Sequence, residues 1–314
     1  MPAVPTLRTW VSGEMASAAI LNSEIRDPAN FYITNPNLGA SVDEAFLLRE
    51  FQKAQDAGDQ AQTDFEAKHL NVPIGLTVRA GRWAGATRWE AATDPALSFD
   101  DLLARSEVVV AGVDGGGLDD LLGLTLLGRE RETRRWLSWS RAWADRGVLE
   151  LRKSEAPKLL DFARDGDLVI VDDLAEANDE LAALVLQVQE AGILAQVGLD
   201  LYGPADADDA LAQVGIEGDM VVGIQQGWRL NGVIKAVENR LANRTMAHAG
   251  QPLMAWCVGN AKVEPRGNAV MITKQGSGFA KIDTLMALFD AAALMALNPA
   301  GAGRSWWDRA SEAA

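Results

Sequence analysis

Four aspartates in this sequence stand where a sheet could gather them into one site. Asp114 ends the apolar run EVVVAGV and is followed by three glycines, and Asp120 comes six residues later. Asp200 ends a second apolar run, ILAQVGL, and Asp283 opens the apolar segment DTLMALFDAAALMAL. Carboxylates are preferred ligands of Mg²⁺ and Mn²⁺, and phosphoryl transfer with two such ions needs several of them. The pattern favours a metal site, with Asp114 as its best candidate.

The glycine-rich turn after Asp114 has a second interpretation. Bare backbone N–H groups in such turns often cradle a phosphate. Here the charges of Asp114, Asp119 and Asp120 would repel a phosphate unless a cation lay between them. Each acid also has a structural explanation, because Asp119, Asp120 and Asp200 suit turns and Asp283 suits the N-cap of a helix. Taken together, the buried strand, the terminal acid and the glycines indicate metal first and phosphate second.

The segments that must position these acids follow the order of a mixed α/β fold. Their apolar patterns predict three consecutive strands, then strands that alternate with helices. The expected strands are residues 107–114, 121–130, 133–143, 167–173, 193–200, 220–226 and 268–274, and the expected helices are 156–166, 178–192, 206–215, 228–243 and 282–299. Asn178 is the expected N-cap of the second helix. This order is that of the ribonuclease H-like fold, an α/β fold with a mixed sheet covered by helices.

Such a sheet brings distant residues together at one edge. In open α/β sheets, sites form at the carboxyl ends of the strands. Asp114 and Asp200 are therefore expected to lie side by side, although many residues separate them in the sequence. The chain has one cysteine and two histidines, so neither an internal disulfide nor a cysteine- or histidine-rich zinc site is expected. Any metal chemistry must then use carboxylates.

The net charge of −15 argues against nucleic-acid binding by the surface as a whole. The segment from Met220 to Asp290 is different, because it holds eight Lys and Arg residues against four Asp and Glu. A local basic rim beside an acidic metal site would suit a phosphodiester substrate. Lys274, Lys281 and Arg266 are the candidate contacts to DNA phosphates, and His248 is a candidate to assist there. Solvated side chains and a structural histidine are the alternatives.

The first 105 residues predict an irregular flanking region. Within it, Ser41 and Glu44 have the spacing of a capping box and predict a helix that begins there. Trp83 and Trp89 are expected to pack against a larger body. No apolar run reaches the 18 residues that a membrane span needs, so we expect no membrane contact.

Several motifs, in order, resemble one protein family. VAGVDGGGLDDLLGLTLLG, VGLDLYG, HAGQPLMAWCVGN and GNAVMITKQGSGFAKIDTLMAL together resemble the nuclease domain of large terminase subunits of tailed bacteriophages, over about residues 107–298. The resemblance implies a ribonuclease H-like fold and metal-dependent cleavage of double-stranded DNA during genome packaging. Carried over by motif, Asp114, Asp200 and Asp283 look like the residues that bind two Mg²⁺ or Mn²⁺ ions, with Asp120 as an accessory acid.

The resemblance also implies a domain organisation. ITNPNLGASVDEAFLLREFQKA and FEAKHLNV resemble the segment that joins the ATPase of this family to its nuclease. We expect residues 1–105 to be that linker and tail of the ATPase domain, residues 106–300 the nuclease domain, and residues 301–314 a C-terminal tail. No GxxxxGK[ST] phosphate loop occurs, so translocase activity is not expected.

The same resemblance implies partners and a location. The partners would be double-stranded DNA, a terminase ATPase domain, a small terminase subunit and a portal protein. The location would be the cytoplasm of a phage-infected or lysogenic bacterium.

Two other functions are compatible with the sequence. GVDGGG resembles the phosphate-binding hairpin of actin-like sugar kinases, but Leu118 stands where that hairpin has Thr or Ser. The chain could also be a non-catalytic docking module of a packaging machine, with acids that serve only the fold. Metal binding at Asp114 and Asp200 would distinguish a nuclease from a docking module.

Overall fold

The computed structural model describes residues 26–35, 37–39, 42–57, 59–70, 82–201, 205–267, 269–274 and 281–301. The chain forms two compact units, Met1–Ala80 and Gly81–Ala314. Among the described residues, no helix combines the length and the apolar character needed to cross a membrane.

The first unit has a small apolar core of its own. A 3-10 helix, η1 (Pro28–Ile33), is followed by α3 (Glu44–Ala57) and α4 (Asp59–Leu70). Phe31, Phe51 and Phe65 pack against one another with ring centroids 5.3–5.8 Å apart. The expected helix after Glu44 is therefore present, while Ser41 of its expected capping box lies outside the described residues.

The second unit begins earlier than the expected boundary at residue 105. Trp83 and Trp89 are buried in its core, as expected for side chains that pack on a larger body. The Trp83 ring lies edge-on to Phe289, with centroids 5.3 Å apart. These contacts, with α5 (Ala86–Trp89) and α6 (Phe99–Arg105), join residues 82–105 to the body that holds the sheet. The unit begins before residue 105 because burial of the large apolar surfaces of Trp83 and Trp89 in its core is favourable.

Within the described residues, the main sheet has seven strands in the order β4-β3-β2-β1-β5-β6, with β7 beside β3. Their bounds are β1 (Ser106–Gly115), β2 (Leu122–Glu130), β3 (Trp136–Asp145), β4 (Leu168–Val171), β5 (Leu194–Asp200), β6 (Val221–Ile224) and β7 (Met246–His248). The first three strands are antiparallel, and the later strands pair in parallel with their neighbours. The predicted mixed sheet is thus confirmed.

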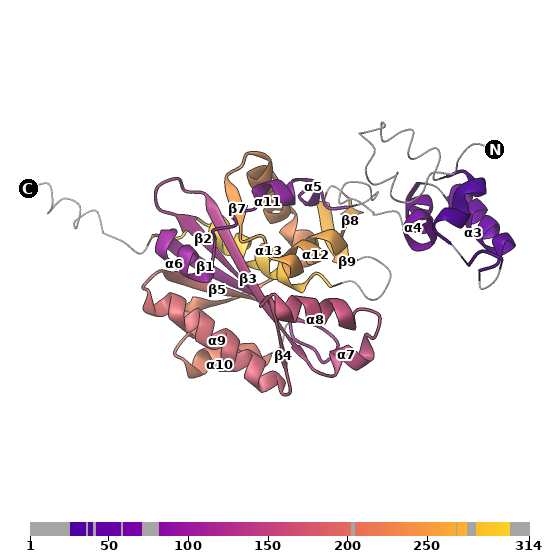
Figure 1. The fold of residues 1–314 in the computed structure, drawn as a ribbon. Coiled ribbons are helices and arrows are strands. Elements are labelled where there is room, and N and C mark those ends of the chain that lie inside the picture. Colours follow the sequence, from indigo (N-terminus) through magenta and orange to yellow (C-terminus); the bar gives the residue numbers. More distant parts are fainter. Residues whose placement is uncertain are drawn as a thin grey trace, which may run out of the picture. The chain divides into compact units, whose positions relative to one another are not determined.

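Helices cover both faces of this sheet (Figure 1). Alternate residues of β1 point to opposite faces, so Val108 and Val110 join one apolar core while Val109 and Val113 join the other. The first core is covered by α11 (Asn231–Ala242), α12 (Pro252–Asn260) and α13 (Asp283–Ala296), and α8 (Ala156–Arg164) also packs into it. The second core is covered by α9 (Leu174–Glu190), α10 (Ala205–Gln213) and α6.

Three details differ from the predicted elements. Asp173 caps α9 by accepting a hydrogen bond from the Ala175 N–H, so Asn178 lies inside the helix and is not its N-cap. Leu-Ala-Glu-Ala between them are good helix formers, which extends the helix by one turn. The expected strand near residue 270 is β9 (Ala269–Lys274), but it pairs with β8 (Ala261–Arg266) in a separate two-stranded sheet. The strands β7 and β8 and the helix α12 were not predicted.

Candidate metal centre

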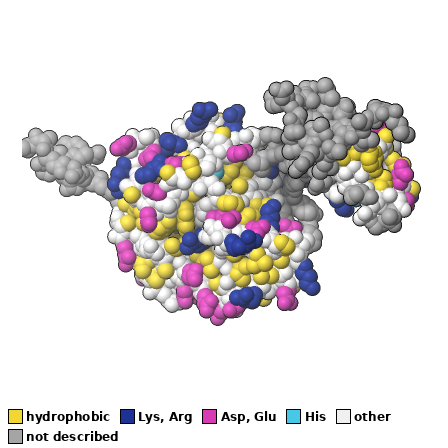
Figure 2. Space-filling model, in the orientation of Figure 1, with side chains coloured by type: hydrophobic (Ala, Val, Ile, Leu, Met, Phe, Trp, Pro, Cys, Tyr) yellow, Lys and Arg dark blue, Asp and Glu magenta, His cyan; other side chains and the backbone are white. Residues whose placement is uncertain are grey.

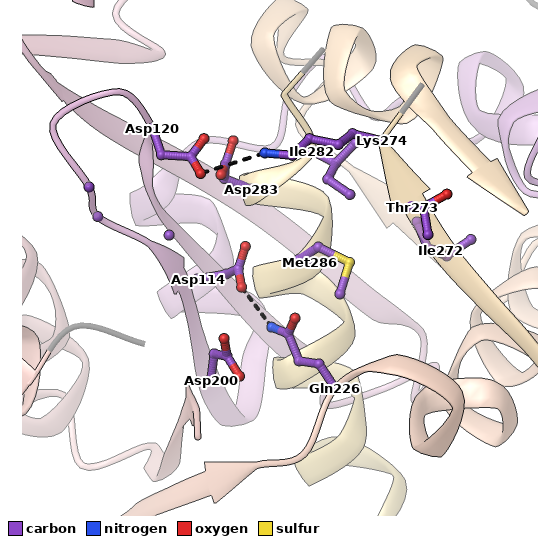
Figure 3. Close-up of a pocket in the computed structure, with 13 residues that line it drawn as sticks. Asp114, Asp120, Asp200, Gln226, Ile272, Thr273, Lys274, Ile282, Asp283 and Met286 are labelled. Carbon is purple, nitrogen blue, oxygen red and sulfur yellow. Dashed lines mark hydrogen bonds and ion pairs between the residues drawn. The ribbon is translucent and has the colours of Figure 1, made fainter. Parts of the chain in front are cut away.

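The ends of two parallel strands place the first two acids. The register of β1 and β5 pairs Val113 with Leu199, so Asp114 and Asp200 follow at adjacent strand ends. Both line a cavity of about 650 Å³ together with Asp120 and Asp283. Figure 3 shows the four acids along one wall of this cavity, with residues 272–274 of β9 on the opposite side. The structure therefore brings together all four predicted acids.

The glycine turn doubles the chain back so that Asp120 faces the same cavity. Gly115 and Gly116 have φ values of +86° and +109°, which L-residues with a side chain rarely adopt. The Gly116 N–H donates to the Leu121 carbonyl at 3.0 Å, and the Asp120 N–H donates to the Gly117 carbonyl at 2.9 Å. The turn thus serves a tight reversal that returns a carboxylate to the strand end.

Asp283 comes from the helix α13, which packs closely on the sheet. A Cβ at Gly123 of β2 would lie 2.9 Å from the carbonyl carbon of Asp283, so only glycine allows this approach. Ile282 is the N-cap of α13, and Asp283 does not cap the helix. Its side chain is 5% exposed and its Oδ2 atom has no hydrogen-bond partner. The N-cap explanation for this residue is therefore wrong.

Burial and mutual repulsion perturb these acids. Burial raises the pKa of Asp114 to about 7, and the charges of Asp200 and Asp120 act in the same direction against a hydrogen bond from Gln226. Burial, followed by the charges of Asp120 and Asp114, also raises the pKa of Asp283 well above its ordinary value. A bound cation would relieve this repulsion.

Asp120 behaves differently because a buried lysine neutralises it. Burial alone would raise the pKa of Asp120, but the hydrogen bond and charge of Lys281 outweigh burial and lower it. The Lys281 ammonium also donates to the Asp119 carbonyl and is only 2% exposed. Lys274 approaches the same carboxylate at 3.8 Å but is half exposed. Lys281 therefore neutralises the acids from within, and its burial gives no support to the predicted contact with DNA.

The surroundings of His248 favour the alternative of a structural histidine over a contact with DNA. His248 is 3% exposed, stacks on Trp89 with centroids 4.1 Å apart, and its Nε2 atom bonds the Trp89 carbonyl at 2.7 Å. Burial lowers its pKa, which favours the neutral imidazole, and the bond to the Trp89 carbonyl joins β7 to the segment around Trp89. Arg266 and Lys274, at opposite ends of the β8–β9 hairpin, remain exposed.

Two residues of the site were missed in the sequence. Gln226, just after β6, donates through Nε2 to Asp114 at 2.6 Å and to Asp290 at 2.9 Å. Asp290 lies seven residues after Asp283 on α13 and is fully buried. Two acids seven apart in an apolar helix share one face, and this spacing could have revealed Asp290. No comparable signal marks Gln226, which holds the orientation of Asp114.

Asp290→Asn is expected to stabilise the metal-free protein more at pH 8 than at pH 4. Burial, followed by the charge of Asp114, raises the pKa of Asp290 well above its ordinary value. A raised pKa in the folded state gives stability that is complete below the unfolded pKa, near 4, and is lost as pH rises through the folded pKa. The neutral side chain of Asn does not ionise, so the variant loses no stability over that pH range. Its amide oxygen still accepts the hydrogen bond from Gln226. Each pKa unit is worth about 1.4 kcal/mol, so the gain in Tm should be on the order of 5 °C at pH 8.

Melting curves in EDTA from pH 4 to pH 8 measure this difference. Asp179→Asn, at an exposed position of α9, is the matched control. A gain for Asp290→Asn that is the same at every pH would contradict the raised pKa.

The donor set suits a hard divalent cation. Four carboxylates line one cavity, and a buried oxygen of Asp283 lacks a partner. Within the described ranges, however, no three His, Cys, Asp or Glu side chains are grouped tightly enough to hold one ion. Asp120 and Asp200 are partly exposed, so changes of their rotamers are the simplest way to bring the carboxylates close enough to hold one ion.

The fold is a mixed sheet covered by helices, and its candidate metal centre is a cavity lined by four carboxylates. Residues 16–298 match the family described as "Terminase large subunit, endonuclease domain", and the chain belongs to this family. The resemblance seen in the sequence motifs is thereby confirmed.

Individual relatives are distant. Protein YmfN of Escherichia coli (strain K12) is 24% identical over 282 residues, which are 83% of this chain and 58% of that protein. The crystal structure of the HK97 bacteriophage large terminase shares the fold, with a TM-score of 0.54, 18% identity, and coverage of 86% of this chain and 54% of that chain. This chain thus spans little more than half the length of these two relatives.

A crystal structure of the large terminase nuclease from thermophilic phage G20c contains bound magnesium. It is 11% identical, covers 67% of this chain and 95% of that chain, and has a TM-score of 0.41.

Proposed function

We propose that this chain cleaves double-stranded DNA with two divalent cations, as the nuclease part of a large terminase during phage genome packaging. The observation that carries the proposal is the cavity shared by Asp114, Asp120, Asp200 and Asp283 at the carboxyl ends of β1 and β5. Membership of the terminase nuclease family supports it.

Each acid has a proposed role in this reaction. Asp114 and Asp200 would hold one Mg²⁺ or Mn²⁺, and Asp283 with Asp114 would hold the second. Bound there, the two ions would activate a water and stabilise the leaving 3′-oxygen. Gln226 would keep one Asp114 oxygen fixed so that the other faces the cavity, since its amide bonds only Oδ1. Lys281 would set the charge and position of Asp120.

The partners of a packaging machine follow from this proposal. A terminase ATPase domain, a small terminase subunit and a portal protein would present the DNA, in the cytoplasm of a phage-infected or lysogenic bacterium. The sugar-kinase alternative has no support, since Leu118 at its hydroxyl position is exposed and the family is one of nucleases. A docking module remains the competing function.

The test is cleavage of supercoiled plasmid by the purified chain. Incubation with millimolar Mn²⁺ or Mg²⁺ should convert the plasmid to nicked and linear forms, and EDTA should stop the conversion. In parallel, calorimetric titration with Mn²⁺ should detect binding that saturates. A chain that neither cleaves DNA nor binds Mn²⁺ would be a docking module.

Duplex DNA binding is expected to be weak, independent of sequence and sensitive to salt. A chain with a net charge of −15 has little general attraction for DNA, so the dissociation constant should be in the non-specific range of about 10⁻⁴–10⁻⁶ M. Charge reversal at Arg266 should weaken binding and slow cleavage without changing Mn²⁺ affinity. Charge reversal at Lys274 should also weaken binding, but it would change Mn²⁺ affinity as well, because Lys274 lines the acid cavity and approaches Asp120. Fluorescence anisotropy at several salt concentrations measures this, with the exposed Lys68→Glu as control. Nanomolar binding to one sequence, indifferent to salt, would contradict the packaging function.

A further inference from the structure

A second cavity, of about 340 Å³, lies at the other end of α13 from the acids. Arg129, Thr133 and Arg134 line it from the end of β2 and the turn that follows, and Arg240 and Thr245 line it from the end of α11 and the loop beyond. Asn298, just past α13, completes this wall. The 14 residues of α13 span about 20 Å, so this arginine cavity is separate from the site around Asp283.

Two of the three arginines share a single acid. Arg129 is 5% exposed, pairs with Glu107, and also donates to the Asn298 side chain at 2.8 Å and the Pro299 carbonyl at 2.9 Å. Arg134 donates to the same Glu107 at 3.0 Å and to Asn298 at 3.2 Å. One carboxylate therefore serves two guanidinium groups.

Arg240 is the third arginine, and no acid compensates it within the described residues. Its guanidinium lies 3.7 Å from the centroid of the Trp136 ring, which fixes it over the cavity wall. Burial lowers the pKa of Arg240, and the charges of Arg129 and Arg134 act in the same direction. The cavity thus holds an excess of positive charge in a chain that is strongly acidic overall.

Basic side chains also lie on the surface over the elements that line this cavity. Figure 2 shows Lys and Arg side chains, with some acids between them, over the upper edge of the molecule, where β2, β7 and α11 lie in Figure 1. An anion that approaches this edge would meet a favourable local field.

Left-handed backbone conformations shape the wall of this cavity. Among the described residues, the non-glycine positions with positive φ are Arg134 at 59°, Arg244 at 57° and Asn298 at 55°. Arg244 and Asn298 directly follow the C-caps of α11 and α13, where this conformation is a common way to end a helix. Arg134 and Asn298 line the cavity, so these chain reversals place their side chains in its wall.

We propose that this arginine cavity binds a phosphate group, supplied either by the DNA backbone or by a small phosphorylated ligand. Guanidinium groups donate paired hydrogen bonds that match phosphate oxygens, and the hydroxyls of Thr133 and Thr245 add donors. The proposal does not depend on metal binding or cleavage, because none of these residues lines the metal site.

Arg240→Gln is the variant that tests the cavity. It removes the uncompensated charge and leaves the bonds of Arg129 and Arg134 to Asn298 intact. Arg88→Gln, at an exposed position of α5, removes the same charge elsewhere and is the matched control. Arg240→Lys keeps the charge and should retain part of the binding, which separates loss of the site from loss of folding.

Two measurements in EDTA distinguish the phosphate sources. Inorganic phosphate, compared with chloride at equal ionic strength, should raise the Tm of the wild type and of Arg88→Gln by about 2–4 °C and raise that of Arg240→Gln by less than half as much. If the DNA backbone is the ligand, Arg240→Gln should also weaken binding to a 30-base-pair duplex and lower the slope of log affinity against log salt by about one. If a small ligand is bound, duplex binding stays unchanged. Equal responses of Arg240→Gln and Arg88→Gln to both probes would overturn the proposal.

Discussion

Asp114→Asn is expected to lower metal-dependent plasmid cleavage by at least about 10³-fold while the protein stays folded. Asp114 is the acid that the other groups of the site surround, since Asp120 and Asp200 perturb its charge and Gln226 fixes its orientation. An amide of the same shape still accepts the bond from Gln226 but brings no negative charge to a cation. Cleavage and Mn²⁺ affinity should therefore fall together.

The fold should tolerate this change. Because burial raises the pKa of Asp114 to about 7, its ionised form is costly above that pH, and Asn removes the cost. The Tm in EDTA at pH 8 should equal or exceed that of the wild type. Initial rates of plasmid cleavage and Mn²⁺ calorimetry measure the loss, with Asp119→Asn in the same turn as control, since Asp119 pairs with Arg152 and does not line the cavity. Full cleavage by Asp114→Asn would sink the assignment of this site.

Lys281→Met is expected to destabilise the metal-free protein by about 3–5 kcal/mol, or on the order of 10 °C in Tm. Lys281 is buried beneath the acids and pairs with Asp120, and it also satisfies the Asp119 carbonyl. Its removal leaves the partly exposed Asp120 and the buried Asp283 without their buried cation, and this costs more than the loss of an exposed ion pair. Methionine keeps most of the volume of the aliphatic part of the lysine side chain. The loss of stability therefore measures the missing charge more than the missing packing.

Lys274→Met supplies a matched control, because Lys274 approaches the same Asp120 carboxylate from a half-exposed position. Its removal should cost less than about 1 kcal/mol. Millimolar Mn²⁺ should raise the Tm of Lys281→Met by more than it raises the Tm of the wild type, because the cation replaces the missing positive charge. Equal and small losses for the two lysine variants would show that Lys281 does not neutralise the site.

Much of the fold could be predicted from the sequence, because burial leaves a local pattern. The apolar runs that end in Asp114 and Asp200 are strands covered on both faces, and their order along the chain specified a mixed sheet. Parallel strands then had to bring those two acids to one edge. The family could also be recognised, since its motifs are short, ordered and local in sequence.

What covers a side chain could not be predicted in this way. Lys281 and His248 looked like candidates for DNA contact, yet segments distant in sequence bury both, and only the packed structure shows this burial. Trp83 and Trp89 are likewise buried by residues distant in sequence, and the unit that contains them therefore begins before the expected boundary at residue 105.

Contacts between side chains on different elements could not be predicted from the sequence either. Gln226, after β6, bonds both Asp114 and Asp290. Arg240, on the helix α11, shares a cavity with Arg129 and Arg134, which lie on β2 and in the turn after it. The sequence by itself determined which residues could carry charge and where strands would end. Only the tertiary structure decided which charges are buried, which are paired and which still face a cavity, because these properties depend on contacts between residues far apart in the chain.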